Sequence, residues 1–308
     1  MRNPAILLAI VSTVLGCHAA RRAEPLVSSA RPVEELPPAE IKLDGAASVP
    51  LLIVNGRPVV EVFLEGKGPY KFAIETGARF VGITPRVVAA LRLARVGGDD
   101  EEPLVRVREI RVGGVRFAGI TAVSLRFGDK EIDGILGLNV FAELLLTVDA
   151  QSGVVRIESG QLPPVDEREV LTLKPIDALV GIDVTIAGKP FVAAVDTRGA
   201  GMLTMMPALA STVTFSGPLR EAGYASGAGI PRTEKKTGRL AGDVRMGTFT
   251  VQRPIVLVHA TPADFPQVPI LGSQLLNEFK FTLDQKHARI RFSRSNPIVP
   301  PTPEPDQH

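Results

Sequence analysis

The sequence has few of the residues that build metal and disulfide sites. Its 308 residues include one cysteine, Cys17, and four histidines, at positions 18, 259, 287 and 308. No two of these histidines have the spacing of metal ligands, and no second cysteine stands near them, so we expect no metal. A single cysteine also excludes an internal disulfide. The sequence contains neither a Gly-x-Ser-x-Gly elbow nor a phosphate-binding Gly-x4-Gly-Lys-Ser/Thr loop, and we expect no cofactor.

The chain also lacks an excess of charge of either sign. It has 35 Lys and Arg residues against 33 Asp and Glu, which gives a formal net charge of +2. Basic residues do not form runs, so nucleic acid is not an expected partner. The apolar run 5–15 is shorter than the about 20 residues that cross a membrane.

That apolar run follows Arg2 and is typical of the core of a signal peptide. It leads into Val14-Leu15-Gly16-Cys17, which resembles a bacterial lipobox. The resemblance implies a lipoprotein signal peptide over 1–17, lipidation of Cys17, and a lipid anchor on the periplasmic side of the cell envelope. A cysteine placed there by chance is the alternative. We interpret 18–49 as a disordered tether and 295–308 as a proline-rich tail.

Glycine and proline, in contrast, are abundant, with 29 and 26 residues. Such a composition favours short strands and many turns over long helices. The sequence also repeats itself. "GKGPYKFAIETGA" (66–78) is similar to "AGKPFVAAVDTRGA" (187–200), and each runs from a turn through an apolar strand to an acidic residue and Thr. We therefore expect a mostly β protein.

A second pair of segments repeats in the same order. "DGILGLNVFAELLLTVDAQSGVVRI" (133–157) matches "VPILGSQLLNEFKFTLDQKHARIRF" (268–292), and in both the interval from the Gly of Ile-Leu-Gly to the Asp of the following turn is 12 residues. We expect a short helix after each Thr-Pro or Met-Pro and after each Ile-Leu-Gly. Asp149 and Asp284 are expected to begin hairpin turns. The two halves, 50–158 and 176–294, are joined by a linker over 159–175.

Together these motifs resemble the retropepsin and pepsin superfamily of aspartic peptidases, in particular its bacterial retropepsin-like proteins, over about 240 residues. The resemblance implies two β-barrel lobes related by a pseudo-twofold axis. It also implies that each lobe places an Asp-Thr-Gly turn beneath an apolar-apolar-Gly strand. Glu75 and Asp196 take the positions of the two catalytic acids. The supporting residues are Thr76, Gly77 and Gly137 in the first half and Thr197, Gly199 and Gly272 in the second.

Two carboxyl groups held face to face cannot both ionise, so one can activate a water while the other donates a proton. Several residues depart from this pattern. Glu75 stands in place of Asp, and its extra methylene moves the carboxyl by about 1.5 Å, more than the ~0.5 Å tolerance of a preorganised site. Arg198 interrupts the second turn, and we interpret it as an inserted residue whose guanidinium points either toward Asp196 or outward. In the family, the position after Gly-Ala usually carries Ser or Thr, and here that position holds Arg79 in the first half and Gly201 in the second.

The sequence therefore supports two functions. One is a lipid-anchored, two-lobed monomer that hydrolyses peptide bonds with Asp196 and Glu75. The other is a pseudoprotease that binds extended peptides or partner proteins in the same cleft. The segment "GYASGAGIPR" (223–232) is a candidate flap, with Tyr224 as its contact residue, and a glycine-rich surface loop is the alternative.

Overall fold

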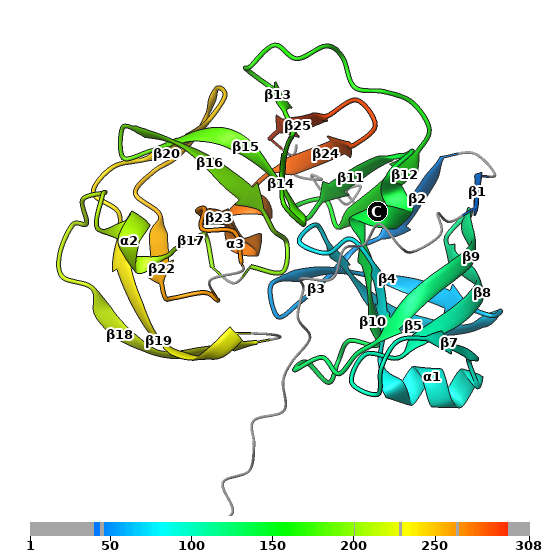
Figure 1. The fold of residues 1–308 in the computed structure, drawn as a ribbon. Helices are drawn as coiled ribbons and strands as arrows, with labels where there is room; N and C mark the ends of the chain where they lie inside the picture. Colours follow the sequence, from blue (N-terminus) through cyan, green and yellow to red (C-terminus); the bar gives the residue numbers. More distant parts are fainter. Residues whose placement is uncertain (1–39, 44–45, 200, 228–229, 263–264, 295–308) are drawn as a thin grey trace, which may run out of the picture.

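The computed structural model describes residues 40–43, 46–199, 201–227, 230–262 and 265–294. In this part of the chain, strands gathered into three sheets account for most of the secondary structure (Figure 1). The predicted mostly β class is therefore confirmed. Cys17, the signal peptide, most of the tether and the proline-rich tail lie outside the described residues.

The N-terminal lobe is built on a nine-stranded sheet. Six of its strands close into a barrel in the order β9, β6, β10, β5, β4 and β8, because β8 also pairs with β9. The strands are β1 (Glu40–Leu43), β3 (Leu52–Val54), β4 (Arg57–Leu64), β5 (Lys67–Glu75), β6 (Val81–Ile83), β7 (Arg95–Gly97), β8 (Leu104–Val112), β9 (Val115–Ser124) and β10 (Gly134–Gly137).

The C-terminal lobe is built on a ten-stranded sheet that curls without such a closing pair among the described residues. Its centre repeats the pairing of the first lobe, since β23 lies parallel to β16 and antiparallel to β17, as β10 does to β5 and β6. The strands are β14 (Lys174–Ile176), β15 (Leu179–Ile186), β16 (Lys189–Val195), β17 (Leu203–Met205), β18 (Arg220–Gly227), β19 (Ile230–Arg239), β20 (Val244–Met246), β21 (Phe249–Val251), β22 (Ile255–Val258) and β23 (Ile270–Leu271).

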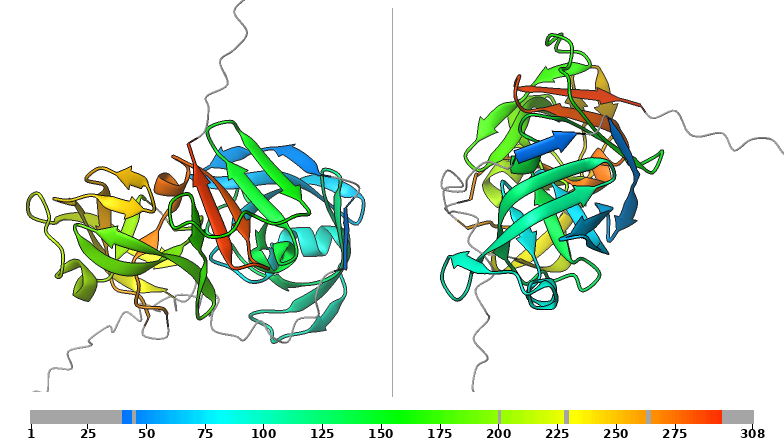
Figure 2. Two further views of the ribbon diagram at one scale, coloured as in Figure 1. Left: turned by 90° about the horizontal axis from the view of Figure 1, so that it is seen from above. Right: turned by 90° about the vertical axis from the view of Figure 1, so that its right-hand side faces the viewer.

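A third, six-stranded sheet joins the two lobes. At its centre β11 pairs with β24, and the hydroxyls of Thr147 and Thr282 lie 2.8 Å apart on facing positions. Figure 2 shows the last strands of the chain, in red, beside green strands of the first half. In sheet order the strands are β13 (Val170–Thr172), β25 (Arg289–Ser293), β24 (Lys280–Asp284), β11 (Leu145–Asp149), β12 (Val154–Glu158) and β2 (Ala47–Pro50).

Short helices follow the motifs at which the sequence predicts them. Both α1 (Pro85–Leu91) and α2 (Pro207–Ala210) begin at a proline, whose missing N–H would have no partner in the first turn. The 3-10 helix η2 (Leu138–Phe141) and α3 (Ser273–Leu276) follow the two Ile-Leu-Gly segments. These predictions are confirmed. The described residues contain no helix of the length and apolarity that crossing a bilayer requires.

The strands bury their apolar faces in a core that continues from one lobe to the other. Strand β8 alternates, with Val105, Val107 and Val112 inside and arginines between them outside. Aromatic rings meet edge to face at Phe117 and Phe141, with ring centroids 5.9 Å apart. The strands that end at Glu75 and just before Asp196 contribute to this core through Phe72 and Ile74 of β5 and Ala193 and Val195 of β16.

Two predicted boundaries are wrong in part. Strand β1 and all of β2 except Pro50 lie within 18–49, the stretch interpreted as tether. Strand β1 pairs with β9, and Ala47 and Val49 of β2 are buried where β2 pairs with β12. Strand β13 lies within the predicted linker 159–175, where Val170 and Leu171 are buried beside β25. Strands this short obtain their partners from distant parts of the chain, so local composition does not reveal them.

Candidate active site

The two acidic turns lie at equivalent strand ends. Glu75 is the last residue of β5, opposite Gly137 of β10, and the Asp196 N–H that follows β16 donates to the Leu271 carbonyl. A Cβ on Gly137 would lie 2.7 Å from the Ala78 carbonyl oxygen, so the turn passes directly behind a residue that must be glycine. Gly137, predicted as a supporting residue, therefore lies directly against this turn.

Hydrogen bonds show which residues of the two turns correspond. The Ala78 N–H donates to the Glu75 carbonyl at 3.2 Å, and the Gly199 N–H donates to the Asp196 carbonyl at 3.0 Å. Ala78 and Gly199 also accept from the first residues of η2 and α3. Gly199 is therefore the counterpart of Ala78, and Arg198 is the counterpart of Gly77.

This correspondence corrects the interpretation of Arg198 as an inserted residue. The next matched bonds reach the Phe80 carbonyl in one lobe and the Met202 carbonyl in the other, so the extra residue of the second lobe lies between Gly199 and Met202. The sequence comparison aligned Gly199 with Gly77 and so misplaced the insertion. The backbone hydrogen bonds to the Glu75 and Asp196 carbonyls instead align Gly199 with Ala78.

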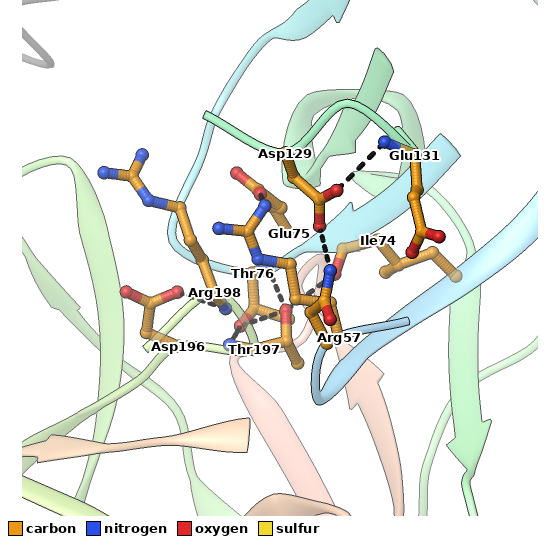
Figure 3. Close-up of polar contacts among 10 residues, drawn as sticks. Arg57, Ile74, Glu75, Thr76, Asp129, Glu131, Asp196, Thr197 and Arg198 are labelled. Atoms are coloured by element: carbon orange, nitrogen blue, oxygen red, sulfur yellow. Dashed lines mark hydrogen bonds and ion pairs between the residues drawn. The ribbon is translucent and has the colours of Figure 1, made fainter. Parts of the chain in front are cut away.

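The threonines that follow the acids cross the seam and bind each other's lobe (Figure 3). Thr76 Oγ1 donates to the Val195 carbonyl at 2.7 Å and accepts the Thr197 N–H at 3.0 Å. Thr197 Oγ1 donates to the Ile74 carbonyl at 2.6 Å and accepts the Thr76 N–H at 3.0 Å. Both residues are fully buried. These reciprocal bonds bring the turns of Glu75 and Asp196 to one seam.

Both acids are buried at that seam, with exposed fractions of 2% for Glu75 and 8% for Asp196. Asp196 Oδ1 accepts the Arg198 N–H at 2.8 Å. The Glu75 carboxyl forms an ion pair with Arg57, whose Nη1 lies 3.8 Å from Oε1. Burial raises the pKa of Glu75 to about 7, with Asp196 adding to the rise while Arg198 and Arg57 oppose it.

Gly77 packs directly against the acid of the other lobe. A Cβ added to Gly77 would lie 2.6 Å from Asp196 Cγ, whereas one on Gly199 would lie no closer than 3.1 Å to any neighbour. Gly77→Ala is therefore expected to displace the Asp196 carboxyl and to lower stability by about 1–3 kcal/mol. Thermal unfolding of the full chain checks this. Gly199→Ala is the matched control, and an equal loss in both variants would contradict the packing argument.

Arg79 ties the first turn to the second lobe. Its Nε donates to the Ala178 carbonyl at 3.0 Å and its Nη2 to the Leu179 carbonyl at 3.3 Å. The residue that replaces the expected hydroxyl thus joins the two lobes instead of supporting an acid. This role of Arg79 could not be inferred from the sequence, because its partners lie about a hundred residues away.

Arg79→Ala is expected to lower the free energy of unfolding by about 1–3 kcal/mol, since both carbonyls lose a charged donor. Urea unfolding at one pH measures the change. Arg116→Ala, on the outer side of β9, is a control for loss of one arginine. Equal stability of the two variants would show that the Arg79 bonds contribute nothing.

Arg57 and Asp129 are site residues that the sequence did not indicate. Asn55 donates to Asp129 Oδ2 at 2.7 Å, and this hydrogen bond is the largest cause of the lowered pKa of Asp129. Arg57 lies near both Asp129 and Glu75 (Figure 3). Asn55-Gly56 was readable as a turn before a strand. No local pattern in the sequence indicates that this turn lies near Glu75, at the end of the following β4–β5 hairpin.

The remaining predicted residues, Tyr224, Asp149 and Asp284, have partners other than the two acids. Tyr224 stands on the β18–β19 hairpin, 58% exposed, with Arg232 stacked 4.0 Å above its ring. A hollow of about 460 Å³ beside this hairpin borders Phe215 and His259, and neither Glu75 nor Asp196 lines it. Asp149 and Asp284 cap their turns as predicted. Within the described ranges, no group of three His, Cys, Asp or Glu is placed to hold a metal.

Each of the two β lobes thus carries one acidic turn to a shared seam, where the crossed threonines clasp the two turns. Residues 60–140 match the model of the aspartyl protease family. The matched segment runs from β4 into η2 and contains Glu75, Thr76, Gly77 and Gly137. This part of the chain is therefore an aspartyl protease domain. A comparison with curated proteins found no match.

Proposed function

We propose that this protein is an aspartic peptidase that hydrolyses peptide bonds with Asp196 and Glu75. The observation that carries the proposal is the pair of buried acids at one seam, one from each lobe, clasped by Thr76 and Thr197. With a pKa of about 7, Glu75 is mostly protonated at clearly acidic pH. The pair can then contain one proton donor and one base, as water activation requires.

In the proposed reaction Asp196 is the base, because the Arg198 N–H already binds its carboxylate oxygen. It takes a proton from water, and the water oxygen bonds to the carbonyl carbon of the peptide. Glu75 gives its proton to the carbonyl oxygen, which leaves a tetrahedral diol. The C–N bond then breaks as the nitrogen takes the proton from Asp196, while one diol hydroxyl returns its proton to Glu75. Both acids end as they began.

The proposed substrate is an extended polypeptide that lies across the seam. The β18–β19 hairpin would cover it as a flap, with Tyr224 in contact. Unpaired strand edges can bind the main chain of such a peptide, as in β-augmentation. We further propose that a lipid anchor at Cys17 holds the two-lobed monomer at the periplasmic side of the cell envelope.

A second function, peptide binding without cleavage, has its own supporting observations. The acid at position 75 is a glutamate, and an arginine occupies the place that Gly77 has in the first turn. A displacement of about 1 Å can reduce catalysis on the order of a hundredfold. The seam would then serve as a binding site for an extended peptide or a partner protein.

Cleavage of an unfolded protein by the full chain, followed from about pH 3.5 to pH 7 with and without a pepstatin-type inhibitor, tests the peptidase proposal. We expect inhibitor-sensitive cleavage that Asp196→Asn abolishes. Asp183→Asn is the control, because this exposed carboxylate of β15 pairs with Lys174 away from the seam. Cleavage that survives Asp196→Asn would overturn the proposal. Peptide binding without cleavage, kept in Asp196→Asn with Glu75→Gln, would establish the second function.

A further inference from the structure

The guanidinium of Arg198 has no hydrogen-bond partner among the described residues. Its backbone N–H binds Asp196, but its side chain forms no ion pair or hydrogen bond with any residue in the described part of the chain. The other two arginines of the seam are occupied, Arg57 near Glu75 and Arg79 with two carbonyls. Arg198 is also partly buried, so water solvates its charge incompletely.

The position of Arg198 directs this charge toward the candidate active site. Its counterpart Gly77 faces the carboxyl of Asp196 in the opposite lobe, so the side chain of Arg198 starts on the side of the seam that faces Glu75. Arg198 is accordingly the charge with the largest effect on the Glu75 carboxyl. Figure 3 shows its side chain extending away from the crossed threonines, with no contact drawn to the guanidinium.

At the acidic pH at which the proposed peptidase would act, neither acid of the site is available to pair with the Arg198 guanidinium. Glu75 is protonated at acidic pH because its pKa is about 7, so it offers Arg198 no negative charge there. Asp196 already accepts a backbone N–H on Oδ1 and is needed as the base. A planar guanidinium pairs best with a carboxylate, through two parallel hydrogen bonds.

We propose that Arg198 determines specificity by binding a carboxylate of the substrate, the side chain of an Asp or Glu residue next to the scissile bond. This inference rests on the proposed function, since it assigns a substrate class to the same site. Arg198 occupies the position that Gly77 has in the first turn. The proposal assigns Arg198 the role of selecting acidic peptides, which a glycine at that position could not do.

Two peptides that differ only by Glu or Gln beside the scissile bond test this inference on the full chain. The wild type is expected to cleave the Glu peptide with a kcat/KM higher by roughly tenfold or more, as for a hydrogen bond to a charged group. Arg198→Gln should reduce the ratio to about one, and Arg198→Lys should leave it intermediate. Arg245→Gln, an exposed arginine of β20, is the matched control that should keep the wild-type ratio.

Binding of the same peptides with a reduced, uncleavable amide separates this inference from the peptidase proposal. A Glu preference in binding that Arg198→Gln removes would support the inference even if no peptide is cleaved, and the absence of cleavage would then count against the peptidase alone. Equal ratios in the wild type and Arg198→Gln, or no preference in either binding or cleavage, would overturn it.

Discussion

Thr76→Val is expected to lower the free energy of unfolding by about 3 kcal/mol, although valine has nearly the shape of threonine. The substitution leaves the Thr197 N–H without its acceptor and the Val195 carbonyl without its hydroxyl donor, both at a fully buried seam. Each buried polar group left unpaired costs about 1–3 kcal/mol. Thr197→Val should have a similar effect, because it removes the reciprocal bonds to Ile74 and Thr76. Urea unfolding of the full chain measures both.

The chain contains a matched control for this prediction. Thr147 and Thr282 face each other across β11 and β24, and their hydroxyls bond to one another at 2.8 Å. Replacing both with valine removes donor and acceptor together, so the double variant should lose less than about 1 kcal/mol. A loss from Thr76→Val no larger than this control would show that the crossed threonines do not hold the lobes together.

The stability of the wild type is expected to fall by roughly 3 kcal/mol as pH rises through the range in which Glu75 titrates. Its pKa is raised from 4.5 to about 7, so the folded state binds a proton that the unfolded state has lost. This contribution is fully present below pH 4.5 and is lost as pH rises through 7. One pKa unit corresponds to about 1.4 kcal/mol. Urea unfolding at a series of pH values measures the change.

Glu75→Gln removes the titrating group while keeping its length. As pH rises from acidic values to about 8, the free energy of unfolding of the wild type should therefore fall by roughly 3 kcal/mol relative to that of the variant. Glu61→Gln, exposed on the neighbouring strand β4, is the control that should follow the wild type because its side chain remains in water. A pH-independent difference for Glu75→Gln would exclude the buried, protonated Glu75.

Much of this arrangement could be predicted from the sequence, because both acidic turns and both Ile-Leu-Gly segments are local patterns. The apolar strands before Glu75 and Asp196 and the prolines that open α1 and α2 are readable from neighbouring residues alone. The third sheet was not predicted. Its central pair, β11 with β24, joins segments more than a hundred residues apart, and no local signal records that partnership.

The polar surroundings of the acids were harder to predict for the same reason. Arg57 reaches Glu75 only because the β3–β4 hairpin folds back onto the seam, where Asn277 donates to the Gly56 carbonyl at 3.0 Å. The inserted residue was predicted at Arg198, whereas it lies between Gly199 and Met202, since two glycines in similar sequences suggested an alignment that the backbone hydrogen bonds do not follow.

Titration of the Glu75 side-chain carboxyl by carbon NMR, in the full chain and in Asp196→Asn, is the most direct measurement of whether the two acids form a pair. A midpoint near pH 7 is expected in the wild type, and a lower midpoint in the variant, because Asp196 raises the pKa of Glu75. A wild-type midpoint near the ordinary 4.5, unchanged by Asp196→Asn, would contradict a buried pair that shares one proton.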